Sequence, residues 1–114
     1  MLERGKTIYI AGKITGDADY KAKFQRAREQ LEARGYIVMD PSVLPDGFAY
    51  EAYMRITGAM LAECDGICLL PDWTESEGAK REREQAIKAG KTVLHAYDLN
   101  KTIYECIRTL IDEA

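Results

Sequence analysis

The sequence predicts a single-domain α/β protein, a three-layer sandwich around a parallel sheet of four to five strands. Short apolar runs alternate with amphipathic helical segments along the chain, in the order β-α-β-α-β-α-β-α. The strand segments are apolar throughout, as strands covered by helices on both faces must be. The chain has 114 residues, 46% of them hydrophobic and 31% charged, which suits one small globular domain.

The first half of the chain contains two predicted strands around one helix. A strand is predicted over 6–12, because β-branched and aromatic residues run up to a glycine there. The segment 17–35 predicts a helix that Gly35 ends, with apolar residues at helical spacing. These residues are Tyr20, Phe24, Ala27 and Leu31. A second strand follows over 36–41, where Pro41 stops it.

The second half alternates in the same way. Helices are predicted over 51–64, 76–90 and 100–114, and strands over 65–71 and 91–97. The apolar face of the helix at 51–64 is predicted to contain Tyr53, Ile56, Met60 and Cys64. Right-handed crossovers between such strands give a parallel, flavodoxin- or Rossmann-like sheet. Ligands of these sheets bind beyond the carboxyl ends of the strands.

Composition and charge argue against several classes of function. The net charge is −3 and no patch rich in Lys and Arg is present, so a nucleic-acid polymer is not the expected partner. No apolar run approaches the roughly 20 residues of a membrane span, and no signal peptide is visible, so a cytoplasmic protein is expected. The cysteines are interpreted as small buried apolar residues, and neither a metal nor a cofactor is predicted. They are Cys64, Cys68 and Cys106.

Glu82 is the charged residue that stands out in the helix at 76–90. On a helical wheel it falls within an arc of small residues, whereas Lys80 lies on the opposite side. The small residues are Gly78, Ala79, Ala86, Ala89 and Gly90. A sheet-facing carboxylate is costly unless it is paired or used in chemistry. Two interpretations remain open: a buried ion pair with Lys13 or Arg55, or a catalytic or sugar-binding carboxylate near the strand ends.

Two turns at predicted strand ends have features of anion sites. Ser76 and Gly78 stand at the start of the third helix, where free backbone N–H groups attract anions. Simple capping, by Ser76 or by Thr74 with Glu77, explains the same residues. The turn Gly12-Lys13-Ile14-Thr15-Gly16 offers more backbone donors and a lysine, although its spacing matches neither a Walker A motif nor a dinucleotide fingerprint.

Two sequence elements resemble the nucleoside 2-deoxyribosyltransferase superfamily, which includes the nucleoside 5′-monophosphate N-glycosidases. The first is Tyr9-Ile-Ala-Gly12, and the second is Ser76-x-Gly78-x-x-x-Glu82-x-x-x-Ala86. The segments IYIAGKITG, GYIVMDPSVLP and CDGICLLPDWTESEGAKRE are similar to a branch that is common in phage and bacterial genomes. The resemblance covers residues 6–95, which is most of the chain.

The resemblance implies roles for the matching residues. Glu82 corresponds to a nucleophile that attacks C1′ of the sugar and expels the base, giving a covalent glycosyl-enzyme that water or a second base resolves. Tyr9 corresponds to a tyrosine that hydrogen-bonds near this glutamate. The positions implied to hold the 5′ end of a nucleotide, or its phosphate, are Gly12, Lys13, Thr15, Ser76 and Gly78. For Trp73, stacking on a base and covering the core as a rim residue both remain open.

One position departs from the resemblance. Enzymes of the superfamily usually carry an Asp eight residues before the Asp that opens the third strand, and Thr57 stands there in this chain. Threonine is no general acid, so three alternatives remain open: Asp72 acts in its place, Glu77 acts in its place, or the base leaves by another route. Three hypotheses follow: an N-glycosidase or deoxyribosyltransferase, a non-catalytic nucleotide-binding module, and a structural protein that kept only the fold. The resemblance also implies a homodimer or higher oligomer, and it leaves the base, the sugar, the phosphate requirement and the acceptor open.

Overall fold

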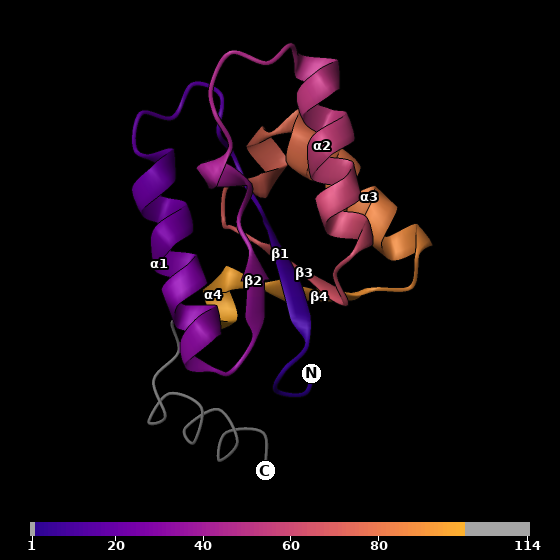
Figure 1. Cartoon of the computed structure of the whole chain (residues 1–114). Helices are drawn as coiled ribbons and strands as arrows, with labels where there is room; N and C mark the ends of the chain where they lie inside the picture. Colours follow the sequence, from indigo (N-terminus) through magenta and orange to yellow (C-terminus); the bar gives the residue numbers. More distant parts are fainter. Residues whose placement is uncertain (1, 100–114) are drawn as a thin grey trace.

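Four short parallel strands form the centre of the protein. The computed structural model describes residues 2–99. The strands are β1 (Thr7–Ala11), β2 (Ile37–Met39), β3 (Gly66–Leu69) and β4 (Thr92–His95), in the spatial order β2-β1-β3-β4 (Figure 1). Every neighbouring pair is parallel. The predicted α/β fold with a parallel sheet is therefore confirmed, with four strands in the described part of the chain.

Helices connect and cover these strands. Within residues 2–99 they are α1 (Tyr20–Ala33), α2 (Tyr50–Ala62), α3 (Glu77–Lys88) and α4 (Ala96–Leu99). The first three agree with predicted helices, apart from small differences at their ends. The strand predicted over 91–97 is wrong at its end, because the chain becomes helical at Ala96, which is buried in the core beside α1. The helix predicted over 100–114 lies outside the described residues.

The sheet separates two apolar clusters, one on each face. α1 and α4 cover the first face, where Ile8 and Ile10 of β1 meet Phe24 and Leu31 of α1. α2 and α3 cover the second face, and Tyr9 of β1 belongs to the cluster there (Figure 1). Because successive side chains of a strand point to opposite faces, β1 directs Tyr9 into the layer of α2 and α3.

The predicted buried face is confirmed for α1 but only in part for α2, where Cys64 is buried and Met60 packs against the core. In α1, the predicted residues are buried or packed against the core. In α2, the buried residues are Thr57 and Leu61, and the predicted Ile56 is only half-buried. The reason lies in the composition of α2, in which Glu51 and Arg55 are the two charged residues among 13. A helix with apolar residues all round does not reveal its inner face by periodicity.

Two of the three cysteines are described, and both are free and buried, as predicted: Cys64 and Cys68. Among residues 2–99, no group of three or more His, Cys, Asp or Glu side chains is arranged to hold a metal ion. None of the helices in this part of the chain has the length and apolar character that crossing a membrane requires.

Candidate active site

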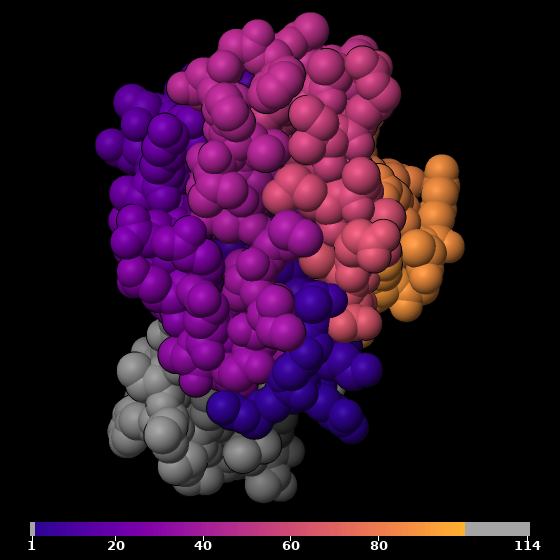
Figure 2. Space-filling model, viewed as in Figure 1, coloured from indigo at the N-terminus to yellow at the C-terminus, as the bar shows by residue number. Residues whose placement is uncertain are grey.

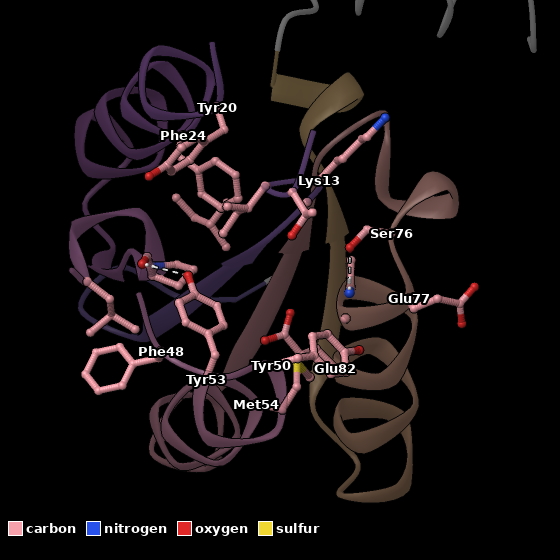
Figure 3. A pocket seen from close by; sticks show the side chains of 18 of the residues that line it. Lys13, Tyr20, Phe24, Phe48, Tyr50, Tyr53, Met54, Ser76, Glu77 and Glu82 are labelled. Atoms are coloured by element: carbon pink, nitrogen blue, oxygen red, sulfur yellow. Dashed lines mark hydrogen bonds between the residues drawn. The ribbon is translucent and has the colours of Figure 1, made fainter. Parts of the chain in front are cut away.

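A cavity of about 530 Å³ lies at the carboxyl end of β1 (Figure 3). Its walls come from the loop after β1, the segment 41–50 between β2 and α2, the first turns of α2, and the N-terminal half of α3. Ligands of parallel α/β sheets bind at this end, and the volume suits a small molecule. The cavity is therefore the candidate active site.

Glu82 and Tyr9 form the buried centre of this cavity. The Tyr9 hydroxyl donates a hydrogen bond of 2.5 Å to Glu82 Oε2. Glu82 is 6% exposed and Tyr9 1%, and both side chains line the cavity. Among the ion pairs of the described residues, none joins Glu82 to Lys13 or to Arg55. The interpretation of Glu82 as half of a buried ion pair with either residue is therefore wrong.

Small residues on α3 turn Glu82 inward. Ala79 and Ala86 are buried on the same helix face, about one turn to either side of Glu82. Gly78 extends this face towards α2, since a Cβ at Gly78 would lie 3.3 Å from the sulfur of Met54. The predicted arc of small residues is confirmed at these positions. Because they let α3 pack closely, the long Glu82 side chain reaches the cavity beside β1.

Burial controls the protonation of this centre. It raises the pKa of Glu82 from 4.5 to about 7, although the hydrogen bonds from Tyr9 and Thr57 act in the opposite direction. Burial also raises the pKa of the Tyr9 hydroxyl well above its usual value, and the neighbouring Glu82 carboxylate adds to the effect. Tyr9 is thus a permanent donor near neutral pH, whereas Glu82 changes its charge there.

Thr57 completes the polar group around Glu82. Its side chain is fully buried, and its hydroxyl interacts with the side chains of both Tyr9 and Glu82. An aliphatic hydroxyl can hold a carboxylate in place but has no proton to give to a leaving base at ordinary pH. The position at which the resemblance implies an acid therefore has a hydrogen-bonding group instead.

The N-terminus of α3 forms one end of the cavity. Ser76 is the N-cap, and its hydroxyl oxygen accepts a hydrogen bond of 3.1 Å from the amide of Ala79. Thr74 lies in the preceding 3₁₀ turn, so the alternative in which Thr74 and Glu77 cap the helix is wrong. The amides of Glu77 and Gly78 have no acceptor among the described residues, and both residues line the cavity. Two free amides at a helix N-terminus are suited to an anion.

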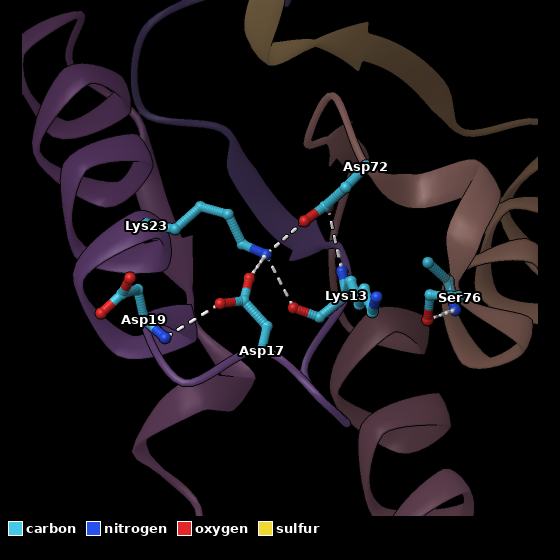
Figure 4. A network of polar contacts seen from close by, with 7 residues as sticks. Lys13, Asp17, Asp19, Lys23, Asp72 and Ser76 are labelled. Carbon is cyan, nitrogen blue, oxygen red and sulfur yellow. Dashed lines mark hydrogen bonds and ion pairs between the residues drawn. The ribbon is translucent and has the colours of Figure 1, made fainter.

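The loop after β1 lies against the same end of the cavity. Gly12, Lys13 and Thr15 all line it, and Lys13 lies beside Ser76 in both close-up views (Figures 3 and 4). A Cβ at Gly12 would approach Leu70 Cδ1 to 2.6 Å, so only glycine fits between this loop and the end of β3. The structure thus brings together the residues that the resemblance implies for the 5′ end of a nucleotide.

Lys23 joins the two loops that form this end (Figure 4). Its ammonium donates to the Lys13 carbonyl at 2.8 Å and to Asp17 Oδ2 at 2.6 Å, and it also pairs with Asp72. Asp72 in turn accepts a hydrogen bond of 3.1 Å from the Lys13 amide. The role of Lys23 could not be predicted from the sequence, because its partners lie on separate loops. Asp72, considered as an acid in place of Thr57, is engaged in this network.

Two other predicted residues lie away from the centre of the cavity. Trp73 is not among the lining residues, and the Arg83 guanidinium lies over its ring, 5.0 Å from the centroid. Trp73 packs against the core, so the rim interpretation fits its position. Glu77 lies at the wall of the cavity, but its side chain points away from the cavity (Figure 3). Its carboxylate pairs with Lys80 at 3.2 Å.

Aromatic side chains form a wall of the cavity that the sequence analysis did not anticipate. Phe48 and Tyr50 are half-exposed, at 49% each, and Tyr53 lies deeper. The Tyr53 hydroxyl donates to the Pro41 carbonyl at 3.2 Å, and burial raises its pKa to about 12. The sequence around Phe48 reads as a turn, and these residues line the cavity because the segment 41–50 and the start of α2 lie beside it.

An α/β domain with a four-stranded, all-parallel sheet covered by helices on both faces belongs to the Rossmann-like fold class. Within this class, the chain belongs to the family described as Domain of unknown function (DUF4406), whose sequence model matches residues 6–95. No curated protein matches the chain in sequence.

Among solved structures, the fold is similar to that of a 2-desoxiribosyltransferase from Leishmania mexicana, with a TM-score of 0.63 and 22% sequence identity. The match covers 79% of this chain and 63% of that chain, so this chain spans less than two thirds of that protein's length. At this identity the likeness shows a shared fold, and function has to be argued from the site. The fold implied by the sequence resemblance is thereby confirmed, and the implied activity stays a prediction.

Proposed function

We propose that the protein cleaves or transfers the N-glycosidic bond of a (deoxy)nucleoside or nucleoside 5′-monophosphate, with Glu82 as nucleophile. The observation that carries this proposal is the buried Glu82 carboxylate, which lines the cavity and is held by Tyr9. A positioned carboxylate of this kind can attack a sugar carbon and form a covalent intermediate. The fold likeness to a 2-desoxiribosyltransferase and the sequence resemblance around Glu82 support the same class of reaction.

The reaction has two steps. The Glu82 carboxylate attacks C1′ of the sugar, and the electron pair of the C1′–N bond leaves with the base, which takes a proton from water. The resulting glycosyl ester reacts with water or with a second base, and Glu82 returns as a carboxylate. The Tyr9 hydroxyl orients Oε2 throughout. Thr57 supplies no acid, so the proposal assigns no protein group to protonate the leaving base.

The remaining predicted residues are assigned to substrate binding. The free amides at the N-terminus of α3, together with the Lys13 ammonium, offer donors and positive charge to a 5′-phosphate. Gly12 and Gly78 allow close backbone approach, and Ser76 and Thr15 add hydroxyls. We assign stacking of the base to Phe48 and Tyr50, which line the cavity, in place of Trp73.

A non-catalytic nucleotide-binding module is the second candidate, and Thr57 is the observation that favours it. A threonine at this position keeps Glu82 and Tyr9 in place without an acid. This alternative predicts that nucleotides bind to the same cavity and that the base is never released.

Release of free base, measured by chromatography from a panel of nucleosides and nucleoside 5′-monophosphates, tests the proposal. We expect release by the wild-type protein and none by Glu82→Gln, while both proteins gain melting temperature with the preferred substrate. A rise in melting temperature without any release would identify the binding module. A folded protein that shows neither would refute both candidates and leave the structural hypothesis.

A further inference from the structure

The polar side chains closest to Glu82 are unsuited to protonating a leaving base. Thr57 interacts with Glu82, and its hydroxyl is no acid at ordinary pH. Tyr9 is a poor acid as well, because burial raises its pKa well above the usual value. Asp72 does not line the cavity, and the side chain of Glu77 points away from it (Figure 3). These four residues therefore give no proton to a base that leaves the sugar.

Negative charge dominates the lining of the cavity. The charged lining residues are one lysine and four carboxylates: Lys13, Asp46, Glu75, Glu77 and Glu82. Among residues 2–99, no arginine or histidine lines the cavity. Asp46 and Glu75 are exposed, and a carboxyl group in contact with water is ionised near neutral pH, so neither supplies a proton. Away from the phosphate end, where Lys13 lies, the charges of the cavity favour a ligand group with positive charge.

Aromatic rings and a carboxylate occur together on one side of the cavity. Phe48 and Tyr50 are half-exposed there, and the segment 41–50 that leads into α2 lies on the surface shown in magenta in Figure 2. Asp46 lies on the same segment, and its carboxylate accepts a hydrogen bond of 3.2 Å from the Tyr20 hydroxyl. The Arg81 guanidinium, itself paired with a glutamate of α2 at 3.1 Å, lies over the Tyr50 ring, 5.7 Å from the centroid. The Tyr50 ring thus already accommodates a flat cation, and such cations bind well to aromatic faces.

We propose that the substrates are N-glycosides whose base is a flat aromatic cation, such as a pyridinium ring or an N7-alkylated purine. This inference rests on the proposed function, in which Glu82 attacks the sugar. The carboxylate forms a bond to C1′, and the C1′–N bond breaks with its electron pair going to the ring nitrogen. The pair neutralises the cation, so the base leaves as a neutral molecule and takes up no proton. Water then attacks C1′ and displaces Glu82 as a carboxylate, and one proton of the water passes to the solvent.

A cationic base matches the site in two ways. It needs no acid, so Thr57 at the position next to Glu82 is compatible with full activity. Its positive charge also favours the ionised form of Glu82, which is the form that attacks the sugar. A neutral base gains neither advantage, because it leaves as an anion unless water protonates it. The preference for a charged base therefore follows from the side chains around Glu82.

Release of base from two matched pairs of nucleotides at pH 7 tests the proposal. The first pair is nicotinamide mononucleotide, whose ring is a cation, and its reduced form, whose ring is neutral. The second pair is 7-methylguanosine 5′-monophosphate and guanosine 5′-monophosphate. We expect kcat/KM to be at least about a hundredfold higher for the cationic member, which is the size of effect that a general acid usually contributes. The pair with the faster cationic member identifies the ring as a pyridinium or as an alkylated purine.

The outcomes separate this inference from the proposed function. If base is released from the neutral members within about tenfold of the rate of the cationic ones, the preference is refuted and the proposed function stands. If none of the four nucleotides releases its base, both the inference and the proposed function are refuted for these substrates. Release that persists in Glu82→Gln would likewise contradict both.

Two substitutions distinguish the missing acid from the greater lability of cationic glycosides in water. Thr57→Asp introduces an acid beside Glu82 and should accelerate only the neutral member, so the ratio within a pair should fall at least about tenfold. Asp46→Asn keeps an oxygen for the Tyr20 hydroxyl but removes a negative charge, so KM should rise about threefold for the cationic member alone. Glu84→Gln removes a charge from the exposed side of α3 and should change neither quantity. Unchanged ratios in both folded variants would overturn the assignment of a cationic base.

Discussion

The Tyr9 hydroxyl and the Glu82 carboxylate meet across 73 positions of sequence, from the middle strand β1 to the second turn of α3. The hydrogen bond lies inside the layer formed by α2 and α3, where water has little access to the carboxylate. The folded protein therefore holds an ionisable group whose pKa of about 7 lies well above the 4.5 of an exposed glutamate. Both stability and activity should depend on pH for this reason.

Glu82→Gln should stabilise the protein at pH 8. The folded pKa of Glu82 is higher than the unfolded one, so the native state binds more protons between the two values and loses stability as the pH rises through them. Ionised Glu82 then costs up to about 3 kcal/mol, which the neutral glutamine avoids. Urea unfolding at pH 5 and pH 8 measures the free energy of unfolding of the variant and of the wild type. The gain in stability of the variant over the wild type should be small at pH 5 and large at pH 8.

The matched control for this substitution is Glu84→Gln on the same helix. Glu84 is exposed, so its neutralisation should leave the pH dependence of the wild type unchanged. Equal pH profiles for wild type and Glu82→Gln would show that the Glu82 carboxyl titrates as an exposed group, contrary to its burial.

Tyr9→Phe should shift the pH dependence of base release to higher pH. The Tyr9 hydrogen bond favours the ionised form of Glu82, which is the form that attacks the sugar, so its loss raises the pKa of the nucleophile. At pH 6, kcat/KM should fall by about tenfold or more. Tyr53→Phe is the control, because its hydroxyl binds the Pro41 carbonyl and its loss should not move the midpoint. If the midpoint were unchanged in Tyr9→Phe, the Tyr9 hydroxyl would not control the pKa of Glu82.

The sequence predicted the sheet and the inward direction of Glu82 for a physical reason. Alternating segments with clear periodicity allow few arrangements, and the alanines around Glu82 mark the inner face of α3. By contrast, α2 has apolar residues on all sides, so its periodicity pointed to Ile56 and away from the true inner residue Thr57. The local pattern fixes a face only where polar residues occupy the opposite one.

The parts of the site that could not be predicted depend on contacts between distant segments. Lys23 sits on α1 among other charged residues, and nothing near it in sequence shows that its ammonium reaches Asp72, 49 positions away. Phe48 follows a turn, and its place in the cavity wall results from how the segment 41–50 packs beside β1. The aromatic ring of Trp73 and its position after a strand suggest that it stacks on a base. In the structure, the Arg83 guanidinium lies over this ring instead.

Thr57→Asp should destabilise the protein most at high pH. It would place a second carboxyl group against Glu82 in a fully buried position, and two adjacent carboxylates cannot both ionise without a large cost. We expect a loss of about 3 kcal/mol or more at pH 8, and a smaller loss at pH 5, where at least one of the two is protonated. The asparagine side chain has nearly the same shape as the aspartate side chain but carries no charge. The loss of stability in Thr57→Asn should therefore not depend on pH. If the stability of the two variants changed with pH in the same way, this result would contradict the contact between Thr57 and Glu82.

Lys23→Met should separate the two loops at the end of the cavity. The substitution leaves the Asp72 carboxylate and the Lys13 carbonyl without their shared donor. We expect the free energy of unfolding to fall by about 2 kcal/mol. We also expect weaker binding of a nucleotide, with KM raised more than kcat is lowered, because Lys23 does not touch the cavity. Lys88→Met, an equal change at an exposed position of α3, should alter neither quantity. If Lys23→Met were less stable but bound nucleotides with unchanged affinity, the Lys23 network would be structural and the loops would keep their places without it.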